Sequence, residues 1–468
     1  MAVKKLLAVF ACLLTVSGYG ISPDFDLTPK IENGVLVYPV PPREPGQRDV
    51  LELRCDPLET VRIAVIGLGM RGSAMTLSFA RVPDAVITVV CDKDEKAVRR
   101  TVRGLKSLGK PEPVAFTGAD DWKGICTRND VDLVCVFTPW VLHTPIAVEA
   151  MKNGKHVAVE VPAALTLREC WELVDTAEKT RRHCMMMENC NYDFFELATL
   201  NMAQQGLFGE IVHAEGAYIH DLRSMHFAEE GEEGHYSDMW RLKESEKRTG
   251  NLYPTHGLGP IAHIMNIHRG DKIDVLVSLS TKQFGMTEYA KRKFGEDSDY
   301  AKTDYKLGDM NTTVVRTEKG KTMMIQHDVT SPRPYSRIHL VSGTKGFAQK
   351  YPQEQIALDP HAHSPLSRTA MNRLIKKYEH PITTEYKKKA KLVGGHGGMD
   401  YILHSRLIYC LKNGLPLDQD VYDAAEWSAF CELTATAAAG NGVSVRFPDF
   451  TRGAWDRLPG VKYYMAGE

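Results

Sequence analysis

An apolar run that leads into three spaced glycines constrains this chain more than any other feature. Residues 61–74 read VRIAVIGLGMRGSA, and Gly67, Gly69 and Gly72 follow the run. A strand, this glycine spacing and a helix together are typical of a dinucleotide-binding turn. The first glycine allows the tight turn, the second lets the backbone approach a diphosphate, and the third lets the helix pack against the sheet. Free N–H groups at the start of the helix would face the phosphates.

An aspartate at the end of the next apolar run supports this interpretation. Asp92 closes the segment AVITVVCD, where its carboxylate is expected to accept hydrogen bonds from ribose hydroxyls. The same negative charge would repel a 2′-phosphate, which favours NAD over NADP. A glycine turn in a cofactor-free sheet is the alternative, and the joint placement of the glycines and Asp92 argues against it.

The pattern of apolar residues predicts two kinds of sheet. From residue 61 to about 185, continuous apolar runs alternate with amphipathic stretches, as in a parallel sheet with helices on both faces. After about residue 190 the apolar runs are longer and include a hairpin turn at TEKGKT, which predicts a largely antiparallel sheet. Two helices close the chain, and residues 284–309 are predicted to form a surface excursion. The fold class is therefore α/β: an N-terminal Rossmann domain plus a C-terminal α+β domain with a large open, mostly antiparallel sheet.

These patterns set the expected domain boundaries. Residues 1–20 have two lysines, an apolar stretch and small residues, which together predict a removed signal peptide and an exported, periplasmic or secreted protein. Cys12 leaves a lipoprotein open as the alternative. Residues 21–58 are rich in proline and are predicted to form an irregular arm. Residues 59–187 are expected to bind NAD, and residues 188–468 to form the catalytic domain.

Composition excludes several classes of function. The formal net charge is -1, so no basic surface for nucleic acid is expected. The apolar stretch of the signal is too short to anchor the chain as a membrane span. The ten cysteines are scattered without CxxC pairs, which predicts buried free thiols and no structural zinc site. Oligomeric state is left open, with a homo-oligomer among the alternatives.

One segment resembles a known superfamily. Residues 143–162, HTPIAVEAMKNGKHVAVEVP, resemble the glucose–fructose oxidoreductase and inositol dehydrogenase superfamily, whose members pair a Rossmann domain with an open antiparallel sheet. Most members carry a lysine after the glutamate, for carbonyl and hydroxyl chemistry. This chain has Val161 there, which cannot carry a proton, and this departure from the superfamily pattern argues against a standard sugar dehydrogenase.

Six further fragments resemble a narrower family. In chain order they are MENCNY, AYIHDLR, MWRLKES, NLYPTHGLGP, SPRPYSR and GGHGGMDY. Together they resemble glycoside hydrolase family 109, the NAD-dependent α-N-acetylgalactosaminidases, over about residues 60 to 450. The resemblance implies that a glycan with a terminal α-linked N-acetylgalactosamine is hydrolysed with net retention. It also implies a tightly bound NAD that oxidises C3 transiently, elimination across C1 and C2, addition of water and return of the hydride.

The resemblance and the chemistry of the side chains suggest the site residues. His256 is the candidate base, because an ordinary histidine pKa lies near neutrality, and Tyr253 and Tyr192 are further catalytic candidates. Arg241 could donate several hydrogen bonds to an acetamido or hydroxyl group. The expected cofactor-binding residues are Gly67, Gly69, Met70, Arg71, Gly72, Asp92, Trp140, His143, Glu160, Val161, Asn189 and Tyr253. The expected substrate-binding residues are Tyr218, Arg241, Tyr253, Pro254, Thr255, His256 and Tyr335.

Other functions stay open at this point. The main alternative is an NAD-dependent sugar or cyclitol dehydrogenase, and another is a non-catalytic sensor; the fold alone separates none of them. His396 between glycine pairs raises the question of a metal. No second ligand follows at metal spacing, so a flexible loop that caps the next helix is favoured and no metal is expected.

Overall fold

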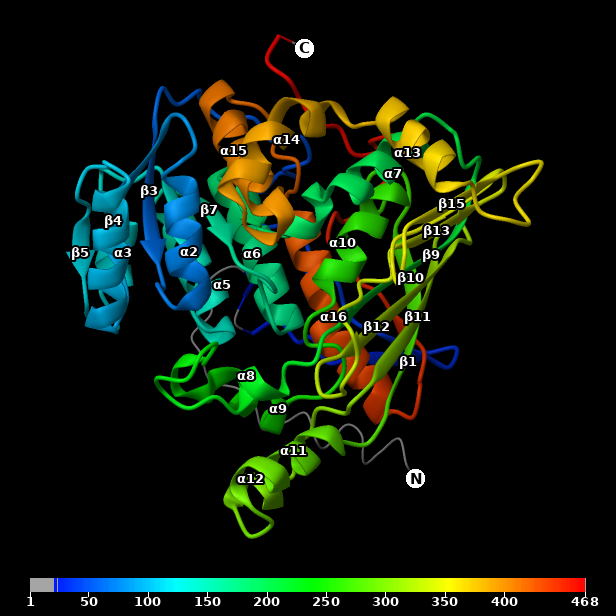
Figure 1. Ribbon diagram of the computed structural model, residues 1–468, viewed down its shortest axis with the longest axis horizontal. Helices are drawn as coiled ribbons and strands as arrows, with labels where there is room; N and C mark the ends of the chain where they lie inside the picture. Colours follow the sequence, from blue (N-terminus) through cyan, green and yellow to red (C-terminus); the bar gives the residue numbers. More distant parts are fainter. Residues whose placement is uncertain (1–20, 23, 468) are drawn as a thin grey trace.

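Two β-sheets organise the molecule, as the computed structural model of residues 21, 22 and 24–467 shows (Figure 1). The first sheet has six strands in the order β5-β4-β3-β6-β7-β8, and every neighbouring pair is parallel. Its strands are β3 (Val61–Ile66), β4 (Ala85–Cys91), β5 (Val114–Phe116), β6 (Leu133–Val136), β7 (His156–Val159) and β8 (Cys184–Met186). The predicted Rossmann domain is thereby confirmed.

Helices cover both faces of this parallel sheet. They are α2 (Met70–Phe79), α3 (Glu95–Ser107), α4 (Trp122–Cys126), α5 (His143–Lys152) and α6 (Leu167–Thr180), with a short helix η2 (Trp140–Leu142) before α5. A capping box between Thr166 and Glu169 begins α6. The pattern of alternating strands and helices did not include the short elements β5, β8, α4 and η2, whose three to five residues carry little periodicity.

The second sheet has ten strands in the order β1-β2-β16-β10-β11-β12-β9-β13-β14-β15. It is mostly antiparallel, as expected, and only the pairs β12–β9 and β16–β2 are parallel. The hairpin predicted at TEKGKT joins β11 to β12. The longer members are β9 (Ile211–Ile219), β10 (Ile273–Ser280), β11 (Asn311–Thr317) and β12 (Thr322–Asp328), and the shorter are β13 (Leu340–Gly343), β14 (Gly346–Gln349), β15 (Gln355–Leu358) and β16 (Val445–Arg446).

The prediction of an irregular arm for residues 21–58 was wrong in one part. β1 (Lys30–Glu32) and β2 (Val35–Val37) form a hairpin that extends the edge of the large sheet. Asn33 and Gly34 at its turn both have positive φ angles, 51° and 82°. Asn-Gly is the typical pair for such a two-residue turn, so the signal was present and the surrounding prolines outweighed it in the prediction.

Buried helices fill the space between the two sheets. α7 (Phe194–Gln204), α10 (Thr255–Ile264) and α16 (Val421–Ala439) lie there, and α16 contacts α6, β8 and β10 (Figure 1). α16 is buried nearly all round and carries apolar residues on every side, as a helix between two layers must. α15 (Met399–Asn413) packs on α2, so the C-terminal part of the chain also covers the Rossmann domain.

The remaining helices lie at the margins. α8 (Arg223–His226), η4 (Ser237–Met239), α9 (Trp240–Lys247), α11 (Gly285–Phe294) and α12 (Asp299–Lys302) extend below the sheets in Figure 1, and α13 (Arg368–Lys377) and α14 (Pro381–Val393) lie near its top. The excursion predicted for residues 284–309 is this α11–α12 unit. Within the described part of the chain, no helix combines the length and apolar character that crossing a membrane requires. The nine described cysteines are free thiols, eight of them buried, as expected.

Candidate active site between the two sheets

The glycine turn between β3 and α2 has the geometry that each glycine was expected to provide. Gly67 has a φ of +90°, and a Cβ there would lie 2.6 Å from the carbonyl group of Phe137. A Cβ on Gly72 would collide with the carbonyl oxygen of Gly67. A Cβ on Gly69 would meet no atom within 4 Å. The packing of the protein therefore requires two of the glycines, whereas the third borders open space.

The side chain of Asp92 stabilises the same turn by hydrogen bonds. Its Oδ2 accepts a hydrogen bond of 2.6 Å from the backbone N–H of Leu68, and its Oδ1 accepts one of 2.8 Å from that of Asp94. A carboxylate has lone pairs to spare for further donors such as ribose hydroxyls. No side chain caps the first turn of α2, whose N–H groups are free for an anion. The turn and Asp92 therefore fit the adenosine diphosphate part of NAD.

Arg71 connects the turn to the strand ends beside it. Its Nε donates to Glu160 over 2.8 Å, and its Nη2 donates to Asp400 over 2.9 Å. Asn189 also donates to Asp400, over 2.7 Å. Three of the expected cofactor-binding residues thus meet in one network, and Asp400, which accepts from Arg71 and Asn189, was not predicted. Burial alone would raise the pKa of Asp400, but the charge of Arg71 and the hydrogen bond from His396 hold it well below its usual range.

His396 belongs to this network and not to a cluster of potential metal ligands. Its Nδ1 lies 2.7 Å from Asp400, and the ring is largely exposed on η5 (His396–Gly398). His396 and its flanking residues Gly395 and Gly397 all have positive φ angles. Among the described residues, the groups of three side chains that could bind a metal ion do not include His396. The segment around His396 is therefore the glycine-rich loop that was expected before α15.

Trp140 and His143 follow β6 and shape the same region. The two ring nitrogens of His143 lie 2.8 Å from the carbonyl oxygens of Pro162 and Thr138, which joins the ends of β7 and β6. Burial lowers the pKa of His143, although both carbonyls raise it. Trp140 packs edge-on against Trp240, with ring centroids 4.9 Å apart. Val161 is buried nearby and exposed Met70 begins α2.

A histidine–carboxylate pair occupies the start of α10. Nδ1 of His256 lies 2.8 Å from both carboxylate oxygens of Glu188, which is completely buried. With Nδ1 protonated, it donates to Glu188 and leaves the lone pair of Nε2 available as a base. Burial by itself would raise the pKa of Glu188, but the charge and hydrogen bond of His256 lower it. Glu188 was not predicted, although it is the second residue of the MENCNY fragment.

Aromatic rings surround His256. The rings of Tyr253 and Tyr218 stand edge-on to the imidazole, with centroids 4.9 and 5.3 Å away. Tyr218 and Tyr253 are 4.6 Å apart, and Tyr335 lies 6.3 Å beyond Tyr218. The guanidinium of Arg241 lies 4.8 Å from the ring of Tyr253. The expected substrate-binding residues are therefore neighbours, and Pro254 and Thr255 begin the helix that carries His256.

Tyr192 lies apart from this group. Its hydroxyl donates to Asp418 over 3.2 Å, and its ring packs against Tyr463 in the protein interior. The side chain is completely buried, and burial together with the charge of Asp418 raises its pKa well above the ordinary value. The structure thus gives Tyr192 a packing role and no contact with His256, contrary to the expectation of a second acid–base group.

The position of His256 depends on a close approach of α10 to β9. A Cβ on Gly257 would collide with the backbone of Ala217, and a Cβ on Gly216 would collide with the carbonyl of Gly257. Because neither residue has a side chain, the helix lies directly on the strand. This contact places His256 beside Tyr218, which follows Ala217 on β9.

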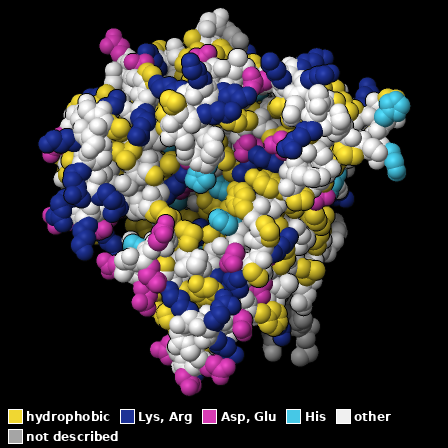
Figure 2. All heavy atoms as spheres, in the orientation of Figure 1, with side chains coloured by type: hydrophobic (Ala, Val, Ile, Leu, Met, Phe, Trp, Pro, Cys, Tyr) yellow, Lys and Arg dark blue, Asp and Glu magenta, His cyan; other side chains and the backbone are white. Residues whose placement is uncertain are grey.

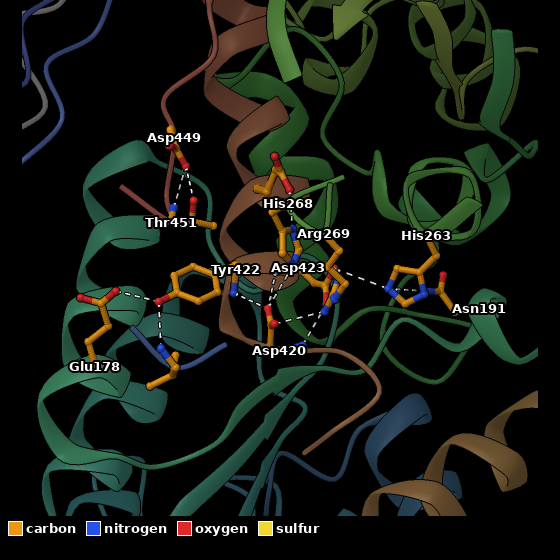
Figure 3. A network of polar contacts seen from close by, with 12 residues as sticks. Glu178, Asn191, His263, His268, Arg269, Asp420, Tyr422, Asp423, Asp449 and Thr451 are labelled. Carbon is orange, nitrogen blue, oxygen red and sulfur yellow. Dashed lines mark hydrogen bonds and ion pairs between the residues drawn. The ribbon is translucent and has the colours of Figure 1, made fainter. Parts of the chain in front are cut away.

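A buried polar network holds α10 in place (Figure 3). Nδ2 of Asn191 is 3.1 Å from the ring of His263 on α10, and that ring faces Asp423 at 3.5 Å. Asn191 belongs to η3 (Asn189–Tyr192), whose N-cap is Glu188. Arg269 donates to Asp423 over 2.7 Å. The network thus fixes the segment that carries Glu188 relative to the helix that carries His256.

His268 should make this network sensitive to alkaline pH. Burial and the neighbouring Arg269 would lower its pKa, but the carboxylates of Asp423 and Asp420 outweigh them and raise it from 6.5 to about 9. A raised pKa stabilises the fold fully below pH 6.5, and this stabilisation is lost as the pH rises through about 9. We expect the difference in thermal midpoint between the wild type and His268→Gln to shrink over this interval. A difference that stays constant from pH 6 to 10 would contradict the assignment.

One face of the molecule is hollowed. Figure 2 shows the face hollowed near its centre, with histidine side chains at the rim, in the area that α2, α15 and α8 border in Figure 1. The ligand site of a parallel α/β sheet is expected at the carboxyl ends of its strands, which carry Asp92, Glu160 and Glu188.

Family models match both halves of the chain. Residues 61–188 match the model described as "Oxidoreductase family, NAD-binding Rossmann fold". Residues 192–457 match the model described as "Glycosyl hydrolase 109, C-terminal domain".

Curated relatives align over most of the chain. A Bacteroides fragilis protein named "Alpha-N-acetylgalactosaminidase" is 54% identical over 415 residues, which cover 89% of this chain and 97% of the relative. A Porphyromonas gingivalis protein named "Glycosyl hydrolase family 109 protein" is 48% identical over 441 residues, which cover 91% and 92%. Among solved structures, a levoglucosan dehydrogenase in complex with NADH and L-sorbose has a TM-score of 0.64 at 18% identity, covering 84% of this chain and 100% of that one. At that identity the likeness shows a shared fold.

Proposed function

The chain belongs to glycosyl hydrolase family 109, and on this basis we propose that it removes terminal α-linked N-acetylgalactosamine from glycans with NAD as a resident cofactor. The pairing of His256 with buried Glu188, among tyrosines and at the same carboxyl edge of the parallel sheet as the dinucleotide turn, is the observation that carries the proposal. A base, sugar-sized aromatic faces and a nucleotide turn at one edge of the sheet are what such a reaction requires.

The cofactor would be held by the residues already described. The α2 N-terminus and Gly69 would hold the diphosphate, Asp92 the ribose hydroxyls, and the region of Trp140, His143 and Glu160 the nicotinamide end. When bound, NAD would supply reversible hydride transfer at the sugar ring and end each turnover in its starting form. We propose that it stays bound between turnovers, so that an exported enzyme needs one NAD per molecule.

The side chains of this protein would handle the protons. His256 is proposed to remove the proton from C2 of the sugar with Nε2, while Glu188 holds the ring and stabilises the imidazolium that forms. Tyr253 is proposed to support this step from its position against the imidazole. Tyr218 and Tyr335 offer ring faces and hydroxyls to the sugar, and Arg241 offers hydrogen-bond donors.

Export is part of the proposal. The signal peptide expected at residues 1–20 lies outside the described residues. An exported protein would meet glycan ends outside the cytoplasm and no free pool of NAD, which is consistent with a cofactor that is recycled on the enzyme.

One experiment separates the proposed hydrolase from a dehydrogenase. Purified protein is incubated with p-nitrophenyl α-N-acetylgalactosaminide without added cofactor, and phenolate release and NADH absorbance are followed together. We expect phenolate release without net NADH, and exchange of the C2 proton with deuterated water. NADH accumulation from free sugar and added NAD, without phenolate release, would favour a dehydrogenase. The absence of both phenolate release and NADH accumulation would favour a non-catalytic sensor.

A further inference from the structure

Arg241 is a buried cation without a carboxylate partner. Its residue is 7% exposed, and Nη1 donates to the hydroxyl of Tyr236 over 3.1 Å. The guanidinium also lies 4.8 Å from the ring of Tyr253 and 5.2 Å from that of Trp140. In the part of the chain that the structure describes, no carboxylate comes within ion-pair distance of it. Its side-chain acceptors among the described residues are the hydroxyls of Tyr236 and Tyr218, so further N–H donors remain for a ligand that supplies a strong acceptor.

Two buried histidines lie close to Arg241. His226 ends α8 and His327 lies on β12, and each is 1% exposed. Neither nitrogen of His226 has a hydrogen-bond partner among the described residues, nor has Nδ1 of His327. Buried polar atoms are nearly always hydrogen-bonded, so these unpartnered nitrogens beside the candidate site have hydrogen bonds to offer to a ligand.

Ring contacts tie both histidines to the sugar-binding residues. His327 pairs with Tyr218 in the β12–β9 register, and their rings are 6.4 Å apart and nearly parallel. The ring of His226 lies 6.3 Å from that of Tyr236, the hydrogen-bond partner of Arg241. The two histidines therefore approach the Arg241 end of the site from two different elements.

Both imidazoles are uncharged near neutral pH. Burial and then the charge of Arg241 lower the pKa of His327 to about 3. Burial lowers the pKa of His226 well below its ordinary value, and the charge of Arg241 adds to this. A neutral imidazole offers one N–H donor and one acceptor nitrogen.

We propose that Arg241, His226 and His327 form the pocket for the acetamido group, and so make the site selective for N-acetylgalactosamine over galactose. This inference rests on the proposed function. The amide carbonyl would accept from Arg241, and the amide N–H would donate to an imidazole nitrogen. The methyl group would lie against the apolar cluster that contains Leu222 and Phe227. A galactoside has a single hydroxyl there, which lacks the separate carbonyl and N–H groups of the amide and its methyl group.

Substrate selectivity tests the pocket. The values of kcat/KM for p-nitrophenyl α-N-acetylgalactosaminide and p-nitrophenyl α-galactoside are compared in the wild type, His327→Phe and His226→Phe. Phenylalanine keeps a ring for packing but cannot hydrogen-bond. We expect the selectivity ratio to fall at least about tenfold in each variant. His213→Phe, a half-buried histidine on the open face of the large sheet, is the matched control and should keep the wild-type ratio.

A conservative variant separates hydrogen bonding from packing, and a binding assay separates sugar binding from turnover. His327→Gln restores a donor and an acceptor and should recover part of the selectivity, with a thermal midpoint near that of the wild type. Equal losses on both substrates would show that the histidines only support the fold, and would overturn the proposal. Quenching of tryptophan fluorescence by free N-acetylgalactosamine and by galactose tests the pocket without turnover. If the wild type cleaves neither glycoside but prefers N-acetylgalactosamine, and the variants lose that preference, the proposed function fails and the pocket stands. If the wild type binds N-acetylgalactosamine and galactose equally well, the proposed acetamido pocket is wrong.

Discussion

His256→Ala is expected to lower kcat on p-nitrophenyl α-N-acetylgalactosaminide by about 10²–10⁴-fold, the usual contribution of a positioned general base. The side chain is mostly enclosed by Glu188, Tyr218 and Tyr253, and its removal takes away the imidazole that is proposed to accept the C2 proton. Bound NAD should stay in place, because no contact ties His256 to the glycine turn. Phenolate release and the NAD content of the denatured protein measure the two effects.

Glu188→Gln separates the positioning role from the base itself. The amide oxygen can still accept from Nδ1 of His256, so we expect a smaller loss of kcat than in His256→Ala. Without the negative charge, the residue at 188 no longer stabilises the imidazolium that forms when His256 accepts the proton, so the loss should fall on kcat and leave KM near the wild-type value. An unchanged kcat would show that Glu188 is only a structural partner.

Tyr192→Phe serves as the comparison for both variants. The hydroxyl of Tyr192 contacts Asp418 and not His256, so its loss should lower stability slightly and leave kcat within about twofold. A loss as large as that of His256→Ala would restore Tyr192 as an acid–base group and contradict the position that the structure gives it.

The difference between Glu188 and Tyr192 shows what the sequence could and could not predict. Both residues belong to the MENCNY fragment, which was correctly singled out. Within the short helix η3, however, residues a few positions apart face different sides, and the periodicity of such a short helix does not show which side faces the site. The fragment could be recognised, but the direction of each side chain is set by packing against α10 and α15.

The Asp400 network was unpredictable for a related reason. Arg71 at the start of α2 and Glu160 at the end of β7 could be placed at one edge of the sheet from the alternating pattern. Asp400, the second carboxylate that accepts from Arg71, is more than 200 residues away in the sequence, on a helix that belongs to the other half of the chain. Long-range ion pairs of this kind leave no local spacing, whereas the glycine turn is encoded within six residues.

Gly72→Ala should cost the protein both its cofactor and part of its stability. The added Cβ would collide with the carbonyl oxygen of Gly67, so α2 must shift away from the turn. Overpacking of this kind typically destabilises by about 1–3 kcal/mol. We expect a lower thermal midpoint, and purified protein with little NAD.

Gly69→Ala is the matched variant in which stability and cofactor binding should separate. Gly69 has φ −59° and ψ −164°, an extended conformation that alanine adopts, and its Cβ would meet no protein atom within 4 Å. The apoprotein should therefore keep the wild-type thermal midpoint. If the diphosphate approaches the backbone here, the added methyl group must weaken NAD binding by at least roughly tenfold, and excess NAD should restore turnover. Wild-type affinity in Gly69→Ala would mean that the open space beside Gly69 is not the phosphate site. The cofactor would then lie elsewhere, and the proton chemistry assigned to His256 would lose the hydride acceptor on which it depends.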